Sequence, residues 1–316
     1  MKLTNGELKK FYFGAYSFEE TEDGYLQAFQ YTHEQMEYFK NKDQFFYDRC
    51  MASTAKTLEF AVGKCTISFD YRILWKGSDD TFELYADGKA VKVYEVKDLA
   101  EEGRLTFEVP EGTKNAVIYL PADATVLIRD FEMDAEAQPP VKGEKVLWLG
   151  DSITQGYGPL RSGSTYVSVA NRHLNYDIIN QGIGGYVYDK GSLMEMPGYH
   201  PDKIIVSLGT NQFGSETMDD VEEYYVRLTE IYGRTIPILT ILPIWREDVP
   251  NCEETLRKYC EGIRRVCEQY DNIRIVDGFE LVPHLSELFL DGLHPNVQGA
   301  ACYGSGLVKE IERLGF

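Results

Sequence analysis

The chain has 316 residues, which is more than one ordinary domain needs and enough for two. Its 51 acidic and 32 basic side chains give a formal net charge of −19, which disfavours nucleic acid and anionic membranes as partners and suits a neutral substrate. No run approaches the roughly 20 apolar residues of a membrane span, and the first ten residues lack the apolar core of a secretion signal. We therefore expect a cytoplasmic protein, and the sequence leaves a homo-oligomer open.

The six cysteines predict neither a metal site nor a disulfide framework. None of them forms a Cys-x-x-Cys pair, and no histidine cluster accompanies them. Cys260 and Cys267 lie two helical turns apart beside Ile263, which is typical of core packing. We expect reduced thiols, no metal and no cofactor.

Between residues 57 and 133, short runs alternate apolar and polar side chains with almost no helical period. Asp87-Gly88 between two such runs is a hairpin signal. This pattern predicts an all-β, jelly-roll-like sandwich as an accessory domain over residues 1–138. The aromatic-rich residues before 57 leave their elements open, although we expect some of them to add strands. The alternating runs are 65–71, 82–84, 91–93, 116–120 and 126–128.

A polar joint over residues 134–140, ending in two prolines, separates this region from one in which strands and helices alternate. The alternation predicts a three-layer α/β/α domain over residues 139–316, with a five-stranded parallel sheet in a flavodoxin-like arrangement. Asn296 is placed to cap the last helix. The expected strands are 145–149, 177–180, 203–208, 236–241 and 273–276, and the helical stripes cover 166–174, 221–232, 256–270 and 297–314.

Polar and glycine-rich segments follow these strands, and ligands collect at the carboxyl ends of the strands in such a sheet. Ser152 follows the first strand, and the loop before the last helix carries Asp291 and His294. A hydroxyl, an imidazole and a carboxylate are what serine-based acyl transfer needs. We predict that Ser152 attacks an ester carbonyl, that His294 takes its proton, and that Asp291 fixes the imidazole tautomer.

A tetrahedral intermediate also needs hydrogen-bond donors that are in place before its negative charge develops. The backbone N–H groups of Ser152 and Gly185 and the side-chain amide of Asn211 are the candidates for this oxyanion hole. Each follows a different strand of the expected sheet. Each segment alone is a common turn, and only their conjunction at strand ends supports a catalytic site.

These segments resemble the SGNH (GDSL-type) hydrolase family in order and near-usual spacing over about residues 145–316. The resemblance implies a catalytic Ser152 with His294 and Asp291, and an oxyanion hole made by Ser152, Gly185 and Asn211. The family usually has an aspartate after that asparagine, where this chain has Gln212; we interpret this as a change outside the oxyanion donors. The matching blocks are Gly150-Asp151-Ser152, Gly185, Gly209-x-Asn211 and Asp291-x-x-His294.

Three aromatic residues near the expected crevice each have two possible roles. Tyr157, Tyr186 and Trp245 would each serve as a platform for a sugar ring or as core packing. A nucleotide site is disfavoured, because no glycine run completes Gly-x-Gly-x-x-Gly and no Walker lysine is present.

The hypothesis is a metal-independent serine esterase that forms an acyl-enzyme on Ser152. A β-sandwich ahead of the catalytic domain is similar to the layout of carbohydrate esterases that remove acetyl groups from plant polysaccharides, so the expected substrate is an O-acetylated sugar or oligosaccharide. The alternatives are a lipase or thioesterase for other acyl esters, and a non-catalytic carbohydrate-binding protein on the same fold.

Overall fold

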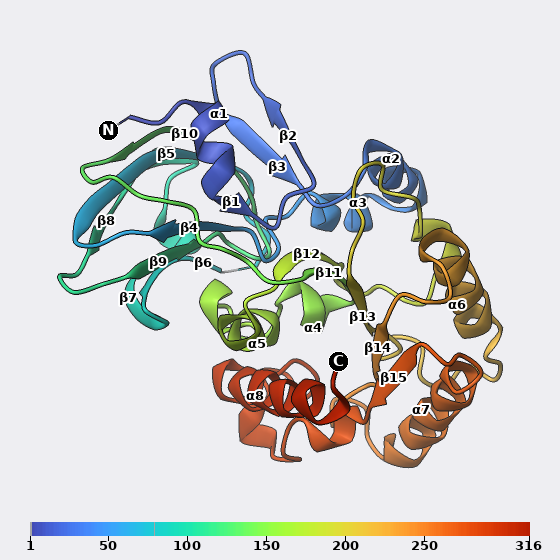
Figure 1. Cartoon of the computed structure of the whole chain (residues 1–316). Helices are drawn as coiled ribbons and strands as arrows, with labels where there is room; N and C mark the ends of the chain where they lie inside the picture. Colours follow the sequence, from blue (N-terminus) through green and yellow to red (C-terminus); the bar gives the residue numbers. More distant parts are fainter. Residues whose placement is uncertain (1, 79) are drawn as a thin grey trace.

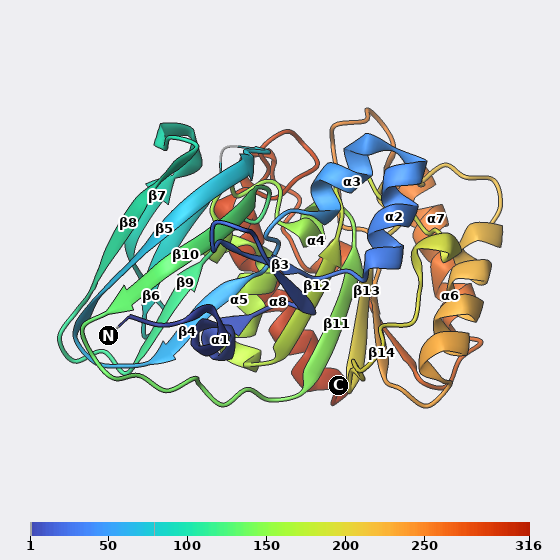
Figure 2. The ribbon, with the colours of Figure 1, turned by 90° about the horizontal axis from the view of Figure 1, so that it is seen from above.

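The structure, a computed structural model, describes residues 2–78 and 80–316. An antiparallel β-region formed by the N-terminal part of the chain lies beside a parallel sheet flanked by helices (Figures 1 and 2). The predicted fold class is confirmed. No helix in the described ranges is long and apolar enough to cross a membrane.

The N-terminal region is a sandwich of two five-stranded sheets with antiparallel pairing. Alternate residues of each strand face the space between the sheets, where Phe69 stacks on Phe107 and Phe131. The first sheet has the order β1 (Tyr12–Phe13), β4 (Thr57–Ala61), β9 (Asn115–Tyr119), β6 (Thr81–Ala86) and β7 (Lys89–Glu95). The second has the order β2 (Ser17–Glu20), β3 (Leu26–Phe29), β10 (Thr125–Met133), β5 (Cys65–Trp75) and β8 (Glu102–Val109).

The segment before residue 57 supplies helices as well as strands. A short helix, α1 (Asn5–Leu8), precedes β1, while α2 (His33–Lys42) and α3 (Gln44–Cys50) follow β3. A capping box between Thr32 and Gln35 begins α2. Both helices lie over the C-terminal region (Figure 1), where Phe39 and Phe46 pack edge-on against Tyr186. The boundary at residues 138/139 stays a prediction, and part of the chain before it packs on the second region.

The C-terminal region is a five-stranded parallel sheet covered by helices on both faces. Side chains of β11 alternate between the faces: Val146 and Trp148 pack with α5 and α8, whereas Leu147 and Leu149 pack with α6 and α7. The strand order is β12 (Asp177–Gly182), β11 (Lys145–Gly150), β13 (Lys203–Ser207), β14 (Ile238–Ile241) and β15 (Ile273–Val276). The helices are α4 (Ser152–Gln155), α5 (Tyr166–Leu174), α6 (Asp219–Tyr232), α7 (Glu253–Cys267) and α8 (Val297–Leu314).

The strand order reverses direction at β11, because the next strands in the chain, β12 and β13, lie on opposite sides of it. Such a switch point opens a crevice at the carboxyl ends of the strands. The residue that follows β11 and begins the next helix is therefore placed at this crevice, and that region of the chain contains Ser152.

Candidate active site

Ser152 is the first residue of the short helix α4, directly after β11. The Asp151 side chain accepts the N–H of Ile153 at 3.0 Å and caps this helix, as expected for a residue that stabilises the turn. Gly150 is required there, since a Cβ at this position would stand 2.2 Å from the Oγ1 of Thr154. The turn therefore fixes the Ser152 hydroxyl at the mouth of the sheet.

The structure brings the three predicted triad residues together. The Oγ of Ser152 lies 2.8 Å from the Nε2 of His294, and the Nδ1 of the same ring lies 2.8 Å from the Oδ2 of Asp291. With the proton on Nδ1, the imidazole donates to the carboxylate, and Nε2 is free to accept the serine proton. Of the five histidines, His294 is the one that contacts Ser152.

Asp291 is held by its own loop. Its Oδ1 accepts the backbone N–H groups of Leu293 and His294 at 3.1 and 2.9 Å. Partial burial alone would raise the pKa of Asp291, but these hydrogen bonds and the His294 ring outweigh it, and the pKa lies below its ordinary value. The carboxylate therefore stays ionised beside the imidazole.

Each of the three predicted oxyanion donors has an N–H without an acceptor among the described residues. Within the described residues, no acceptor is found for the backbone N–H of Ser152 or Gly185, so both are open to a ligand. Gly185 has φ +73°, which favours glycine, and this conformation turns the chain after β12. The Asn211 amide donates to the carbonyl of Tyr186 at 2.8 Å, which leaves its other N–H for the substrate.

The loop that carries Asn211 is braced from two sides. Gln212 accepts the N–H of Tyr188 at 2.6 Å and donates to Asp220 at 3.2 Å. Arg246, which is buried, donates to the carbonyl of Thr210 at 2.7 Å. Gln212, in the place where an aspartate is usual, thus acts on the loop and not on the oxyanion position.

A buried glutamine connects the oxyanion loop to the sandwich. Gln155 of α4 accepts the N–H of Gly184 at 2.6 Å and donates to Asp123 at 2.6 Å. Gln155 and Asp123 are 2% and 5% exposed, so water competes little for these bonds. Since Gly184 and Gly185 are neighbours in the chain, this contact orients the backbone beside one of the predicted oxyanion donors.

Side chains of the N-terminal region line one side of this site, which the sequence did not predict. A Cβ on Gly185 would stand 3.3 Å from the Phe45 ring, and one on Gly184 would stand 2.8 Å from the Nε of Arg49. The Arg49 guanidinium lies over the ring of Phe45, and Trp75 is 5.5 Å away on the sandwich. The aromatic run 45–47 indicates that this segment packs against something, but the sequence does not show that its neighbours are Gly184 and Gly185.

The three predicted aromatic platforms have different surroundings. Tyr157 is half-buried and meets the His294 ring edge-on at 4.6 Å, which places it at the crevice. Trp245 stacks on His284 at 5.2 Å and is partly buried. Tyr186 is 4% exposed and its hydroxyl donates to Asp189, so its side chain is core packing and is not available to a substrate.

Asp151, next to Ser152, is a buried carboxyl. Burial raises the pKa of Asp151 to about 7, and the Ile153 N–H and the charge of Arg246 offset only part of that rise. Within residues 2–78 and 80–316, no three His, Cys, Asp or Glu side chains are grouped as a metal site would require.

Residues 148–302 match the GDSL-like Lipase/Acylhydrolase family, and the match spans Ser152, Gly185, Asn211, Asp291 and His294. The predicted resemblance to the GDSL-type hydrolases is confirmed by this match.

Proteins similar to this chain include a multidomain esterase of Ruminococcus flavefaciens, 24% identical over 217 residues that make up 53% of this chain. The chain spans 28% of that relative's length. Among solved structures, a salicylyl-acyltransferase from a tetracycline biosynthetic pathway aligns with 100% of this chain and 97% of its own, with a TM-score of 0.77 and 19% identity. An acetyl xylan esterase of Butyrivibrio proteoclasticus aligns with 100% and 98%, with a TM-score of 0.64 and 15% identity. At these identities the two structures establish the fold.

Proposed function

We propose that this protein is a serine esterase that removes short acyl groups, chiefly O-acetyl, from carbohydrates. The observation that carries the proposal is the chain of two 2.8 Å hydrogen bonds from Ser152 through His294 to Asp291. The match to the acylhydrolase family supports an ester as substrate.

The geometry supports a two-step mechanism. Ser152 Oγ attacks the ester carbonyl carbon while its proton passes to Nε2 of His294. The oxygen of the tetrahedral intermediate takes hydrogen bonds from Ser152, Gly185 and Asn211. Collapse breaks the bond to the alcohol, which leaves with the proton from His294, and the acyl group remains on Ser152. Water then attacks with the same imidazole as base, which releases the acid and restores the serine.

Three observations support an acetylated carbohydrate. The Phe45 ring beside Gly185 narrows the space next to the carbonyl position, which favours a small acyl group. Phe45, which is 45% exposed, and Tyr157 offer aromatic surface to a sugar alcohol. The similar acetyl xylan esterase carries the same arrangement of a β-rich N-terminal region and an α/β region.

The test is release of acetate from acetylated xylo-, cello- and manno-oligosaccharides, read by mass, with acetyl, butyryl and octanoyl p-nitrophenyl esters alongside. We expect deacetylation of at least one sugar, a preference for acetyl over octanoyl, and loss of at least about a thousandfold in rate in Ser152→Ala. A preference for octanoyl would favour a lipase or thioesterase. Unchanged hydrolysis in Ser152→Ala would reject the esterase mechanism and leave the non-catalytic binding protein as the alternative.

A further inference from the structure

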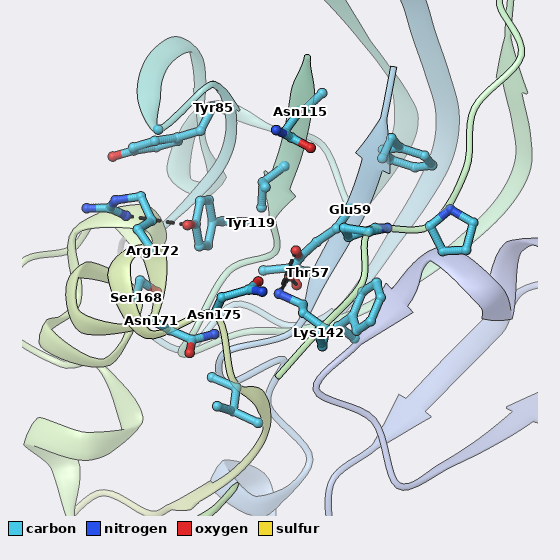
Figure 3. Close-up of a pocket in the computed structure, with 18 of the residues that line it drawn as sticks. Thr57, Glu59, Tyr85, Asn115, Tyr119, Lys142, Ser168, Asn171, Arg172 and Asn175 are labelled. Carbon is cyan, nitrogen blue, oxygen red and sulfur yellow. Dashed lines mark hydrogen bonds and ion pairs between the residues drawn. The ribbon is translucent and has the colours of Figure 1, made fainter. Parts of the chain in front are cut away.

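A second cavity lies far from Ser152, between the sandwich and the α/β region. It has a volume of about 720 Å³ and is lined by β1, β4, β6 and β9, by the joint at residues 139–142 and by α5 (Figure 3). Protein interiors hold few voids larger than a water molecule, whereas small-molecule sites measure about 300–1,000 Å³. A cavity of this size is therefore a candidate ligand site.

This cavity and the catalytic crevice lie at opposite ends of the parallel sheet. Tyr176 and Ile178 line the cavity at the amino end of β12, whereas Gly182 at the carboxyl end pairs with Gly150, two residues before Ser152. At about 3.3 Å per residue, the strand separates the two sites by roughly 16 Å. A ligand in the cavity is thus not the group that reacts at Ser152.

The floor of the cavity is a grid of outward-facing side chains on one sheet. Glu59 pairs with Val117, and Val117 pairs with Tyr85 in the next strand. A neighbouring row runs from Thr57 to Tyr119. Because sheet strands lie about 4.8 Å apart, the four strands from β1 to β6 give a floor roughly 14 Å across. This length fits an extended ligand and exceeds what one small ion needs.

Residues 139–142 and α5 lie opposite this floor, and two contacts set their distance from it. At one end, Lys142 Nζ bonds the two carboxylate oxygens of Glu59 at 2.8 and 2.7 Å, with both side chains largely buried. At the other end, the Arg172 guanidinium of α5 lies 4.9 Å from the ring centroid of Tyr85 and also contacts Tyr119. Figure 3 shows these two groups at opposite sides of the pocket. They fix the width of the space between them.

The wall chemistry indicates a neutral, hydroxyl-rich ligand. Lys142 pairs with Glu59, and the two other charged lining residues, Asp87 and Arg172, are of opposite sign, so the cavity wall has no formal net charge. The Asn115 side-chain amide has no partner among the described residues and lines the space. Tyr85 and Tyr119, each 7% exposed, add only a small ring area to the same wall. Rings, amides and hydroxyls in an elongated cavity are a combination that suits sugars.

We propose that this cavity is a carbohydrate-binding site, distinct from the catalytic crevice, that holds a short neutral oligosaccharide against the outer face of the β1-β4-β9-β6-β7 sheet. The proposal rests on the proposed function in one respect, namely that carbohydrate is the substrate. It adds a second sugar site, by which the sandwich holds one part of a glycan while Ser152 acts on another glycan or a distant part.

The test is isothermal titration of the full chain carrying Ser152→Ala with unacetylated xylotetraose, cellotetraose and mannotetraose. Val117→Trp fills the centre of the floor, and Val91→Trp is the matched control, because Val91 is exposed on β7 outside the cavity. We expect one tetrasaccharide at least to bind, about tenfold weaker binding with Val117→Trp, and unchanged binding with Val91→Trp. No binding by any of the three, or equal binding by both tryptophan variants, would overturn the proposal.

A milder variant covers the case in which the larger side chain prevents folding. Asn115→Ala removes an exposed amide from the cavity edge, and we expect about threefold weaker binding of the same tetrasaccharide. Unchanged binding by Asn115→Ala, where Val117→Trp does not fold, would also reject the site.

Activity separates this inference from the proposed function. In the chain with Ser152 intact, Val117→Trp is expected to keep the parent rate on p-nitrophenyl acetate and to raise KM for the acetylated oligosaccharide. Sugar binding without any deacetylation of sugars would reject the proposed function and retain the second site. Deacetylation with the parent KM in Val117→Trp would reject the second site and retain the function.

Discussion

Asn211 shows how one side chain serves two partners in the site. Its amide donates one N–H to the Tyr186 carbonyl at 2.8 Å, and we predict that the other N–H donates to the oxyanion. Because the charge exists only in the transition state, a donor at this position lowers the barrier and contributes little to substrate binding.

Asn211→Ala is therefore expected to lower kcat by about 100- to 1,000-fold with little change in KM, measured on p-nitrophenyl acetate. Gln212→Ala is the matched control, since Gln212 braces the same loop through Tyr188 and Asp220 without reaching the oxyanion. We expect this control to lose thermal stability and much less activity. Parent-like kcat in Asn211→Ala would show that Asn211 is not an oxyanion donor.

Asp151 predicts a pH dependence of stability. Its pKa rises from an ordinary 3.8 to about 7 on folding, because burial disfavours its charge. Between these values the folded chain binds one more proton than the unfolded chain, so this residue lowers the free energy of unfolding as the pH rises from about 4 to about 7.

Asp151→Asn keeps an oxygen for the Ile153 N–H and removes the titration. The thermal midpoint of the variant minus that of the parent should therefore increase as the pH rises from about 4 to about 7. Circular dichroism in matched buffers measures both midpoints. A constant difference between the two midpoints from pH 4 to pH 7 would contradict a raised pKa at Asp151.

At the level of secondary structure, α4 links catalysis to the sandwich. Gln155, in its last turn, holds the Gly184 N–H on one side and Asp123 on the other. Gln155→Ala should lower kcat by about tenfold without a matching rise in KM, because one oxyanion donor loses its orientation.

Gln35→Ala is a matched control for that variant. Gln35 is equally buried and bonds Gln181 and the carbonyl of Ser192, with no bond to Gly184 or Gly185. Both variants are expected to unfold at lower temperature, and only Gln155→Ala to lose kcat. Equal losses of kcat in the two would indicate a general packing defect.

The regular elements of the α/β region could be predicted because their signals are local. Strand 273–276 coincides with β15, and stripe 166–174 coincides with α5, since apolar side chains there repeat with the period of the element. Asn296 caps α8 as expected, by accepting the N–H groups of Gln298 and Gly299.

The site residues that follow strands of one sheet could be predicted, because the carboxyl ends of parallel strands meet at one edge. Ser152, Asp291 and His294 meet as their segments indicated, and their catalytic roles stay predictions. The docking of α3 and the bond between Asp123 and Gln155 were not predictable, because they depend on how two regions pack. The same packing removed Tyr186 from the substrate surface.

For the whole molecule, an ion pair joins the two regions. Arg161 makes two 2.9 Å bonds to Glu83, which is fully buried in the sandwich. Arg161→Ala would leave this charge buried without its partner, which costs about 3–5 kcal/mol of the free energy of unfolding. Urea unfolding measures this loss.

Lys190→Ala provides the comparison. Lys190 pairs with Glu223 at 2.9 Å with both side chains about half exposed, so its removal should cost less than about 1 kcal/mol. Equal effects of the two substitutions on the free energy of unfolding would mean that the inter-region pair does not hold the regions together.

The most direct test of the central claim, an activated serine at Ser152, is labelling of the full chain with a fluorophosphonate, followed by peptide mass analysis. We predict one adduct, on the peptide that contains Ser152, together with loss of acetyl ester hydrolysis. Ser152→Ala and His294→Ala should take up no label. An adduct on another residue, or an unlabelled Ser152 in a chain that still hydrolyses acetyl esters, would contradict the account.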